Sequence, residues 1–223
     1  MSGPTDEIGA RTDTGRAEGF SDGVLAIVIT LLVLELRVPE GEPGELLSGL
    51  VKQWPSYAAY VASYLYVAVI WLNHKATFSR VREADRGLHW ANLLVLFSTA
   101  LLPFPTSVLS RTLQEHDLPD QRVATVLYAL VGVVVCISWL MLYHYLATHR
   151  ELLVEGVAPG FFPSERLRAL IGLVLYALGG LLGFLVNPLA GLAIFILLPP
   201  FYGLTSGGLY STRLVPHRRA ADD

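Results

Sequence analysis

Residues 53–74 read QWPSYAAYVASYLYVAVIWLNH and contain no Asp, Glu, Lys or Arg. The hydrocarbon core of a bilayer is about 30 Å thick, and a helix needs roughly 20 consecutive apolar residues to cross it. This stretch therefore predicts one transmembrane helix. The composition of the whole chain fits that class, because 53% of its 223 residues are hydrophobic and only 16% are charged.

Three further stretches lack charged residues. Residues 87–110 and 123–149 are each long enough for one membrane-spanning helix. Residues 169–212 are about twice as long as one helix needs, and Asn187-Pro188 near the middle is a typical turn sequence. We therefore expect two helices in this last stretch.

The first apolar run, residues 23–34, is short for a membrane span. A full crossing here must include Asp22, Glu35 or both, and a carboxylate inside a membrane is costly unless it is paired or reaches water. Counting this helix, the sequence predicts an all-α integral membrane bundle of six transmembrane helices. We find no internal repeat and no second domain.

The positions of Lys and Arg predict the orientation. With six spans, both termini and the loops at 75–87 and 149–168 lie on one side of the membrane. That side holds 12 of the 16 Lys and Arg residues, and the other side holds Arg37, Lys52, Arg111 and Arg122. Basic residues are enriched on the cytoplasmic side, so we expect both termini there.

The polar ends of the chain set the domain boundaries. Residues 1–15 are rich in Gly, Thr and Asp, and we expect a disordered cytoplasmic tail there. Residues 16–213 form the predicted six-helix transmembrane domain, and 214–223 form a second cytoplasmic tail. The lone cysteine, Cys136, is expected to be a small packed side chain.

The first helix has an apolar stripe. At about 100° per residue, Ile27, Leu31 and Leu34 fall within roughly 40° of one direction. Phe20 lies beside them, and Thr30 lies about 60° away. The stripe faces a pore, a neighbouring helix or lipid.

Two polar residues point elsewhere on the same helix. Ser21 and Asp22 lie about 120° to 140° from the stripe, so we expect them to face the protein and to be hydrogen-bonded. Arg16 precedes Asp22 by six residues, and we expect a structural ion pair between the two side chains.

The sequence around these residues resembles the signature of the transmembrane protein 175 family, the potassium channels of lysosomes and of many bacteria. The matching residues are Arg16-x-x-x-Phe20-Ser21-Asp22-Gly23-Val24-x-Ala26-Ile27-x-x-Thr30-Leu31-Leu32-x-Leu34-Glu35. Weaker similarities are Trp71-x-x-His74, Asn92 and Pro103-Phe104-Pro105. The single six-helix unit is similar to bacterial members of that family.

The resemblance implies how the chain works. Members of the family surround a central pore with four copies of the first helix, so this chain is expected to form a homotetramer. Ile27, Leu31 and Leu34 match the side chains that constrict the pore, and Thr30 matches a position linked to potassium preference. The Phe20-Ser21-Asp22 triplet, with Arg16, Trp71, His74 and Asn92, would be a packing and hydrogen-bonding motif.

The expected selectivity has a partial physical explanation. The Thr-Val-Gly-Tyr-Gly filter loop of ordinary potassium channels is absent from the sequence. Apolar rings close a pore by dewetting, and potassium loses its hydration water at lower cost than sodium. Acids after the first helix would concentrate monovalent cations at the outer mouth, and these are Glu35, Glu40, Glu42 and Glu45.

Other functions stay open or are excluded. A proton-coupled secondary transporter using Asp22 or His74 is the main alternative, although the sequence shows no clear broken helix or inverted repeat. A non-conducting membrane scaffold is the third. The stripe itself is also compatible with plain helix packing, and the Thr30 hydroxyl with a bond back to a carbonyl one turn earlier.

Several classes lack a sequence basis. The histidines show no metal-ligand spacing, and nothing resembles a nucleotide-binding loop or a catalytic dyad. We therefore expect no enzyme, no metal, no cofactor and no nucleic-acid partner. The expected location is the plasma membrane of a bacterium, with the lipid bilayer and permeating K⁺ as the partners.

Overall fold

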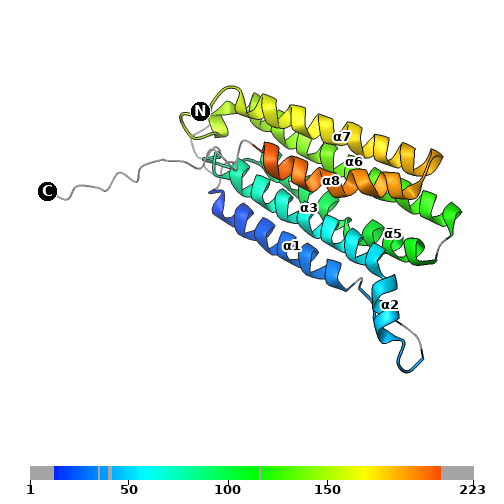
Figure 1. Cartoon of the computed structure of the whole chain (residues 1–223). Coiled ribbons are helices and arrows are strands. Elements are labelled where there is room, and N and C mark those ends of the chain that lie inside the picture. Colours follow the sequence, from blue (N-terminus) through cyan, green and yellow to red (C-terminus); the bar gives the residue numbers. More distant parts are fainter. Residues whose placement is uncertain (1–12, 35, 40–41, 116, 207–223) are drawn as a thin grey trace, which may run out of the picture.

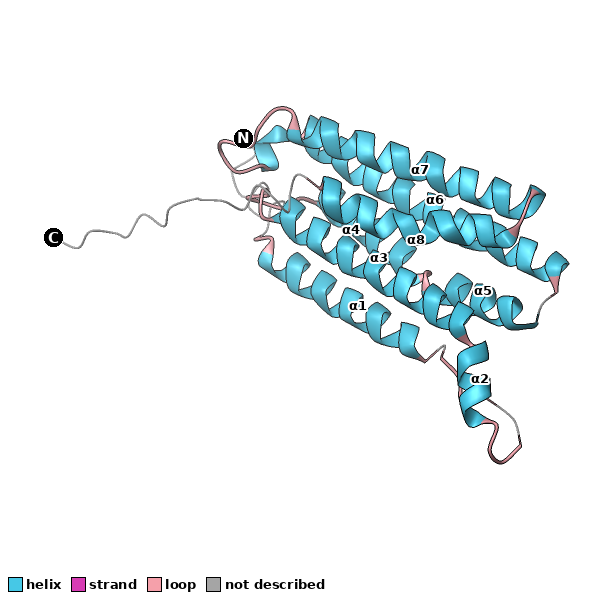
Figure 2. Ribbon diagram, in the orientation of Figure 1, coloured by secondary structure: helices cyan, strands magenta, loops and turns pink. Residues whose placement is uncertain are grey.

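The computed structural model describes residues 13–34, 36–39, 42–115 and 117–206. Every regular element in this part of the chain is helical (Figure 2). The elements are α1 (Gly15–Val33), α2 (Leu46–Lys52), α3 (Trp54–Phe78), α4 (Arg86–Ala100), α5 (Pro103–Glu115), α6 (Leu118–Thr148), a 3₁₀ turn η1 (Arg150–Leu152), α7 (Phe161–Leu185) and α8 (Pro188–Thr205). The all-α prediction is confirmed.

The long helices lie side by side in one bundle (Figure 1). α1 lies at one edge and packs against α3 and α4, while α6, α7 and α8 form the opposite side. The start of α1 and the end of α8 lie at the same end of the bundle. The described chain therefore crosses the bundle an even number of times.

Five of the described helical segments are long and apolar enough to cross a membrane: α3, the α4–α5 pair, α6, α7 and α8. α1 has 19 residues, which span about 28 Å, and it runs alongside α3. Its three charged residues, Arg16, Glu18 and Asp22, fall within only 19 residues, so α1 has no uncharged stretch as long as those of the other five. With α1, the bundle has the six crossings that the sequence predicts. The side on which the termini lie stays a prediction from the Lys and Arg positions.

The third crossing is two helices and not one. The stretch forms the one span that the sequence predicts, but α4 ends at Ala100 and α5 begins at Pro103, so the span contains a break that we did not expect. Proline has no N–H to donate to Thr99, and instead the Leu102 N–H donates to the Thr99 carbonyl at 3.1 Å. The Phe104 N–H donates to the Leu101 carbonyl at 3.2 Å in the same tight pattern. These i to i+3 bonds turn the chain between the two halves.

A side chain caps the start of α8. α7 ends at Leu185 and α8 begins at Pro188, and the Asn187 side chain accepts a hydrogen bond from the Leu189 N–H at 2.8 Å. The predicted turn at Asn187-Pro188 is confirmed. The short helix α2, Leu46–Lys52, lies in a segment that we expected to be a loop.

Asp85 caps α4 and ties it to α6. Its carboxylate accepts from the Leu88 N–H at 2.8 Å and from the Tyr145 hydroxyl at 2.7 Å. Partial burial alone would raise the pKa of the Asp85 carboxyl, but these two hydrogen bonds outweigh that effect and the pKa lies below its usual value. The ionised form is therefore the one that the folded protein favours.

α6 and α7 approach each other closely because glycines line their contact. A Cβ atom at position 132 would lie 2.4 Å from Cδ1 of Tyr176. A Cβ atom at position 180 would lie 2.6 Å from Cβ of Ala129. Only glycine leaves room for these neighbours, so the contact between α6 and α7 is already filled at both positions.

Candidate functional site

One face of α1 is buried against the rest of the subunit. Its buried residues, spaced three or four apart, are Ala17, Ser21, Leu25, Val28 and Leu32. Helical neighbours at this spacing share a face, and this one packs on α3 and α4. Burial of this face fixes the rotation of α1 about its own axis relative to α3 and α4.

A buried hydrogen-bond chain joins α1, α4 and α3. The Asn92 amide nitrogen donates to the Ser21 hydroxyl oxygen at 2.9 Å, and Ser21 donates to the Ala17 carbonyl at 2.7 Å. The Asn92 amide oxygen lies 2.9 Å from Nε2 of His74. Since this oxygen can only accept, Nε2 of His74 carries the proton. His74 also stacks on Phe78, with ring centroids 4.2 Å apart.

The chain is fully enclosed. Ser21, Asn92 and His74 are each at most 3% exposed. Hydrogen bonds between helices hold polar side chains that would otherwise be costly inside a membrane protein. The structure therefore brings together three of the predicted motif residues as a connector between helices.

Asp22 has a different partner from the one we expected. The Trp71 indole N–H donates to Oδ1 of Asp22 at 2.8 Å, and the ammonium of Lys75 lies 5.5 Å from the Trp71 ring centroid. Among the described residues, no ion pair joins Asp22 to Arg16, which is exposed. The predicted ion pair was wrong, because a second helix offers Asp22 a donor at closer range than a residue six positions away on α1.

The opposite side of α1 is uncovered. Ile27 is 60% exposed, Leu31 42% and Leu34 70%, and Phe20 is 57% exposed. These are large apolar side chains, and together they form a continuous stripe along the helix. A stripe of this kind on one subunit requires lipid or another chain to cover it, or a conduit to line.

Thr30 lies next to this stripe and is exposed. Its hydroxyl donates to the Ile27 carbonyl at 2.8 Å, which is the backbone bond considered from the sequence. The donor is used, but the oxygen keeps lone pairs that face outward. Both roles of Thr30, backbone bonding and cation contact, are compatible in this geometry.

Two glycines accompany the stripe. A Cβ atom built at Gly19 or at Gly23 would meet no other atom within 4 Å. Packing inside the subunit therefore does not require glycine at either position. This distinguishes them from Gly132 and Gly180, whose neighbours leave no room for a side chain.

The predicted acids of the outer mouth are only partly covered by the structure. Glu35 and Glu40 lie outside the described residues. Glu42 and Glu45 are described and are exposed, on the segment that leads into α2.

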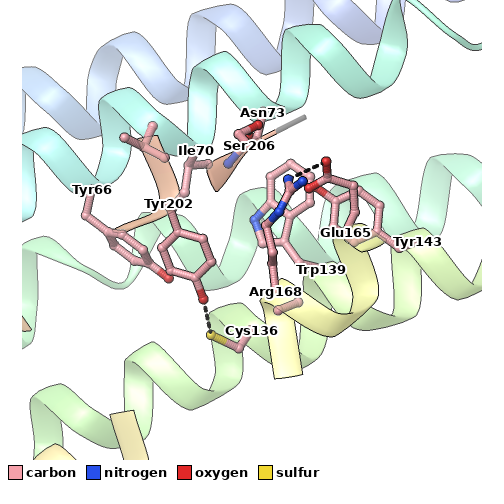
Figure 3. A pocket seen from close by; sticks show the side chains of 12 residues that line it. Tyr66, Ile70, Asn73, Cys136, Trp139, Tyr143, Glu165, Arg168, Tyr202 and Ser206 are labelled. Carbon is pink, nitrogen blue, oxygen red and sulfur yellow. Dashed lines mark hydrogen bonds and ion pairs between the residues drawn. The ribbon is translucent and has the colours of Figure 1, made fainter. Parts of the chain in front are cut away.

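A cavity of about 30 Å³ lies inside the subunit, between α3, α6, α7 and α8 (Figure 3). The Tyr202 hydroxyl points to the sulfur of Cys136 at 3.5 Å, and Glu165 pairs with Arg168 at 2.6 Å at the polar end. This volume holds roughly two water molecules. None of its lining residues comes from α1.

Among the described residues, no three His, Cys, Asp or Glu side chains gather as a metal site would require.

Comparison with known proteins gives consistent relatives. The profile of one family, described as endosomal/lysosomal potassium channel TMEM175, matches residues 16–103. A potassium channel of Streptomyces collinus is 40% identical over 210 residues, which cover 94% of this chain and 98% of that protein. The human endosomal/lysosomal proton channel TMEM175 is 32% identical over 136 residues, which cover 56% of this chain and 27% of that protein.

A solved structure has the same fold. It is the crystal structure of a lysosomal potassium-selective channel TMEM175 homolog from Chamaesiphon minutus, and it superposes with a TM-score of 0.75 at 34% sequence identity. The match covers 87% of this chain and 98% of that one. With its apolar helices, this chain is a multi-pass membrane protein, and it belongs to the TMEM175 family, a family of ion channels and not of enzymes.

Proposed function

We propose that this chain is a potassium-permeable cation channel of a bacterial plasma membrane, in which four copies place α1 around a central pore. The observation that carries the proposal is the uncovered stripe of Ile27, Leu31 and Leu34, next to a face of α1 that hydrogen bonds hold against the subunit. The names of the relatives as potassium channels support the choice of ion.

The distribution of residue sizes around α1 supports the assembly. Leu31 and Leu34 lie within about 40° of Ile27, while Gly19 and Gly23 lie about 40° to 80° round the helix, away from the buried face. A neighbouring copy packing on the glycines would come close, because no side chain holds it off. The large side chains would then point to the axis. One copy contributes one α1 helix to the lining of the pore, so a closed pore needs several copies.

Selectivity in this arrangement would come from dehydration. Rings of Ile27, Leu31 and Leu34 provide no hydrogen bonds, so an ion that passes them must lose part of its water, and potassium does so at lower cost than sodium. The outward lone pairs of Thr30 would replace some of the lost water. Acids after α1 would favour cations over anions at the mouth.

The proton-coupled transporter stays as the second candidate. Asp22 and His74, its expected proton carriers, are both hydrogen-bonded between helices and lie off the stripe. Several animal relatives, the human one among them, are named proton channels. The proton is therefore the second permeant ion to measure.

Flux from liposomes tests the proposal. Purified protein is reconstituted in K⁺-loaded liposomes, and the K⁺ flux is followed with and without a protonophore. In a channel, K⁺ efflux without the protonophore sets a membrane potential that limits the efflux, and with the protonophore H⁺ entry balances the charge and the efflux is sustained. A proton-coupled carrier instead moves a solute only together with protons. A scaffold moves neither.

Two substitutions test whether the stripe of α1 lines the pore. Ile27→Ala should widen the constriction and weaken discrimination against Na⁺, and Thr30→Ala should lower the K⁺ preference while conduction is retained. Leu130→Ala is the matched control, because Leu130 is 57% exposed on α6, away from α1. Unchanged reversal potentials in mixed K⁺ and Na⁺ for both α1 variants would show that this stripe does not line the pore.

A further inference from the structure

The Phe20-Ser21-Asp22 triplet does not act as one unit in the structure. Ser21 is fully buried in the chain to Asn92, and Asp22 accepts the Trp71 indole. Phe20 is on the other side of the helix, with 57% of its surface exposed. The packing and hydrogen bonds that explain Ser21 and Asp22 therefore do not explain a phenylalanine at position 20.

Phe20 is in register with the stripe. It precedes Ile27 by seven residues, as Ile27 precedes Leu34, and seven residues turn a helix by about 700°, which returns to within about 20° of the start. The same step advances about 10 Å along the axis. Phe20, Ile27 and Leu34 thus occupy three levels of one line on α1.

The neighbouring positions indicate which way this line faces. Gly19 and Gly23 flank Phe20 on one side, and a Cβ atom at either position would meet nothing within 4 Å. A neighbouring helix that packs on these glycines would direct the ring of Phe20 toward the axis, at the same angle as Ile27. A ring directed at lipid would instead turn Ile27, which shares its angle on the helix, away from the pore.

We propose that Phe20 of each copy forms a further apolar ring about 10 Å from the Ile27 ring, at the end of the pore that the Lys and Arg count assigns to the cytoplasm. This rests on the proposed channel function. The ring would restrict the inner mouth by dewetting, while the electron-rich faces of the four phenyl rings attract a cation that has lost part of its water. Phe20 is therefore a pore-lining residue, and Ser21 and Asp22 position the helix that carries it.

Cysteine accessibility tests this directly. The only native cysteine, Cys136, is 2% exposed, so the wild-type chain supplies a low background. Phe20→Cys, Ile27→Cys and the control Leu130→Cys are each reconstituted and treated with a membrane-impermeant, positively charged methanethiosulfonate. We expect the treatment to lower the K⁺ flux of Phe20→Cys by at least about fivefold and to leave Leu130→Cys unchanged.

The outcomes separate this inference from the proposed function. Block of Ile27→Cys without block of Phe20→Cys would keep the pore and overturn the Phe20 ring. No block of either variant would count against an α1 pore altogether.

A size series gives a second readout that does not depend on labelling. Phe20→Ala should raise the K⁺ flux several-fold, Phe20→Leu should change it less than about twofold, and Phe20→Trp should lower it. Each variant must elute as the same oligomer as the wild type. Equal flux from the Ala, Leu and Trp variants would contradict a ring at the inner mouth.

Discussion

The glycines of α1 and the glycines of the α6–α7 pair have opposite surroundings. At Gly132 and Gly180 the neighbouring helix already fills the space that a side chain would take. At Gly19 and Gly23 that space is empty in the single subunit. Glycine therefore allows a helix contact that is present between α6 and α7, whereas on α1 it leaves a surface that no other described helix of the chain contacts.

This difference separates folding from assembly. The contact between α6 and α7 at Gly132 and Gly180 is filled within one copy of the chain, so these glycines are needed for the fold. α1 is held by hydrogen bonds on one face, and in the proposed assembly its other face contacts further copies of the chain. Identical substitutions in the two regions should accordingly have different consequences.

The largest effect is expected for Gly132→Val. A valine there would place its side chain on the ring of Tyr176, whose Cδ1 is only 2.4 Å from the position of the first added carbon. Overpacking of this kind costs about 1–3 kcal/mol and displaces α7. Thermal unfolding in detergent should show a clearly lowered Tm and less monodisperse protein. A wild-type Tm would mean that α6 and α7 are not in close contact.

Gly23→Val should disturb the assembly of the copies and not the fold of the single chain. The subunit has room for the side chain, and valine is no worse than glycine in a helix, so the subunit should unfold at the wild-type temperature or slightly above. The fraction of assembled oligomer and the K⁺ flux should fall several-fold. Cross-linking followed by size-exclusion chromatography measures the first quantity. Full assembly of this variant would remove the glycines of α1 from the subunit contact.

A smaller effect is expected for Asn92→Leu. This substitution removes the link from α4 to both Ser21 and His74 and should cost about 1–2 kcal/mol. Because the link positions α1, the K⁺ flux should change as well. Ser98→Ala is the control, since its bond to Ser138 joins α4 to α6 without touching α1. A flux change of equal size in the control would argue against a specific role of the Asn92 link.

The smallest effect concerns pH. The pKa of Asp85 is lowered in the folded state, so its contribution to stability is present above the unfolded pKa of about 3.9 and is lost as the pH falls through the folded pKa. Asn is an equally good helix cap, so Asp85→Asn should approach the wild-type Tm only well below pH 4, where Asp85 is protonated in the folded protein as well. At pH 7 its Tm should be slightly lower than that of the wild type. If the difference in Tm between Asp85→Asn and the wild type were the same at every pH, the lowered pKa of Asp85 would be refuted.

The crossings were predictable because a membrane imposes a length on apolar segments. The uncharged residues 53–74, 123–149 and 169–205 overlap the helices that their lack of charge predicts, with the turn at Asn187-Pro188, although α7 already begins at Phe161. The break before Pro103 was not predicted, because hydropathy does not register a missing N–H. Pro103 and Pro105 are the signal that would have located it.

The candidate site was predictable in its angles but not in its partners. The predicted angle matches the structure for Ser21, which is fully buried and bonded to Asn92, whereas Asp22 accepts a hydrogen bond but is exposed and does not face the interior as we expected. The pairing of Asp22 with Trp71 could not be derived, because it joins residues 49 positions apart and depends on how α3 sits beside α1. Sequence proximity favoured Arg16, and distance in space decided otherwise. The pore roles of Ile27, Leu31, Leu34 and Thr30 stay predictions.

The break between α4 and α5 gives the third crossing two separate anchors. The half that begins at Arg86 is tied to α1 through Asn92, whereas the half that begins at Pro103 is tied to α3 through the bond of Thr106 to Ser63 at 2.8 Å. A shift of α1 would thus act on the first half through this hydrogen bond and on the second half only through packing, and the two residues between the halves would act as a pivot. Because the third crossing is made of two separate helices, a movement of α4 near one membrane surface need not move α5 near the other.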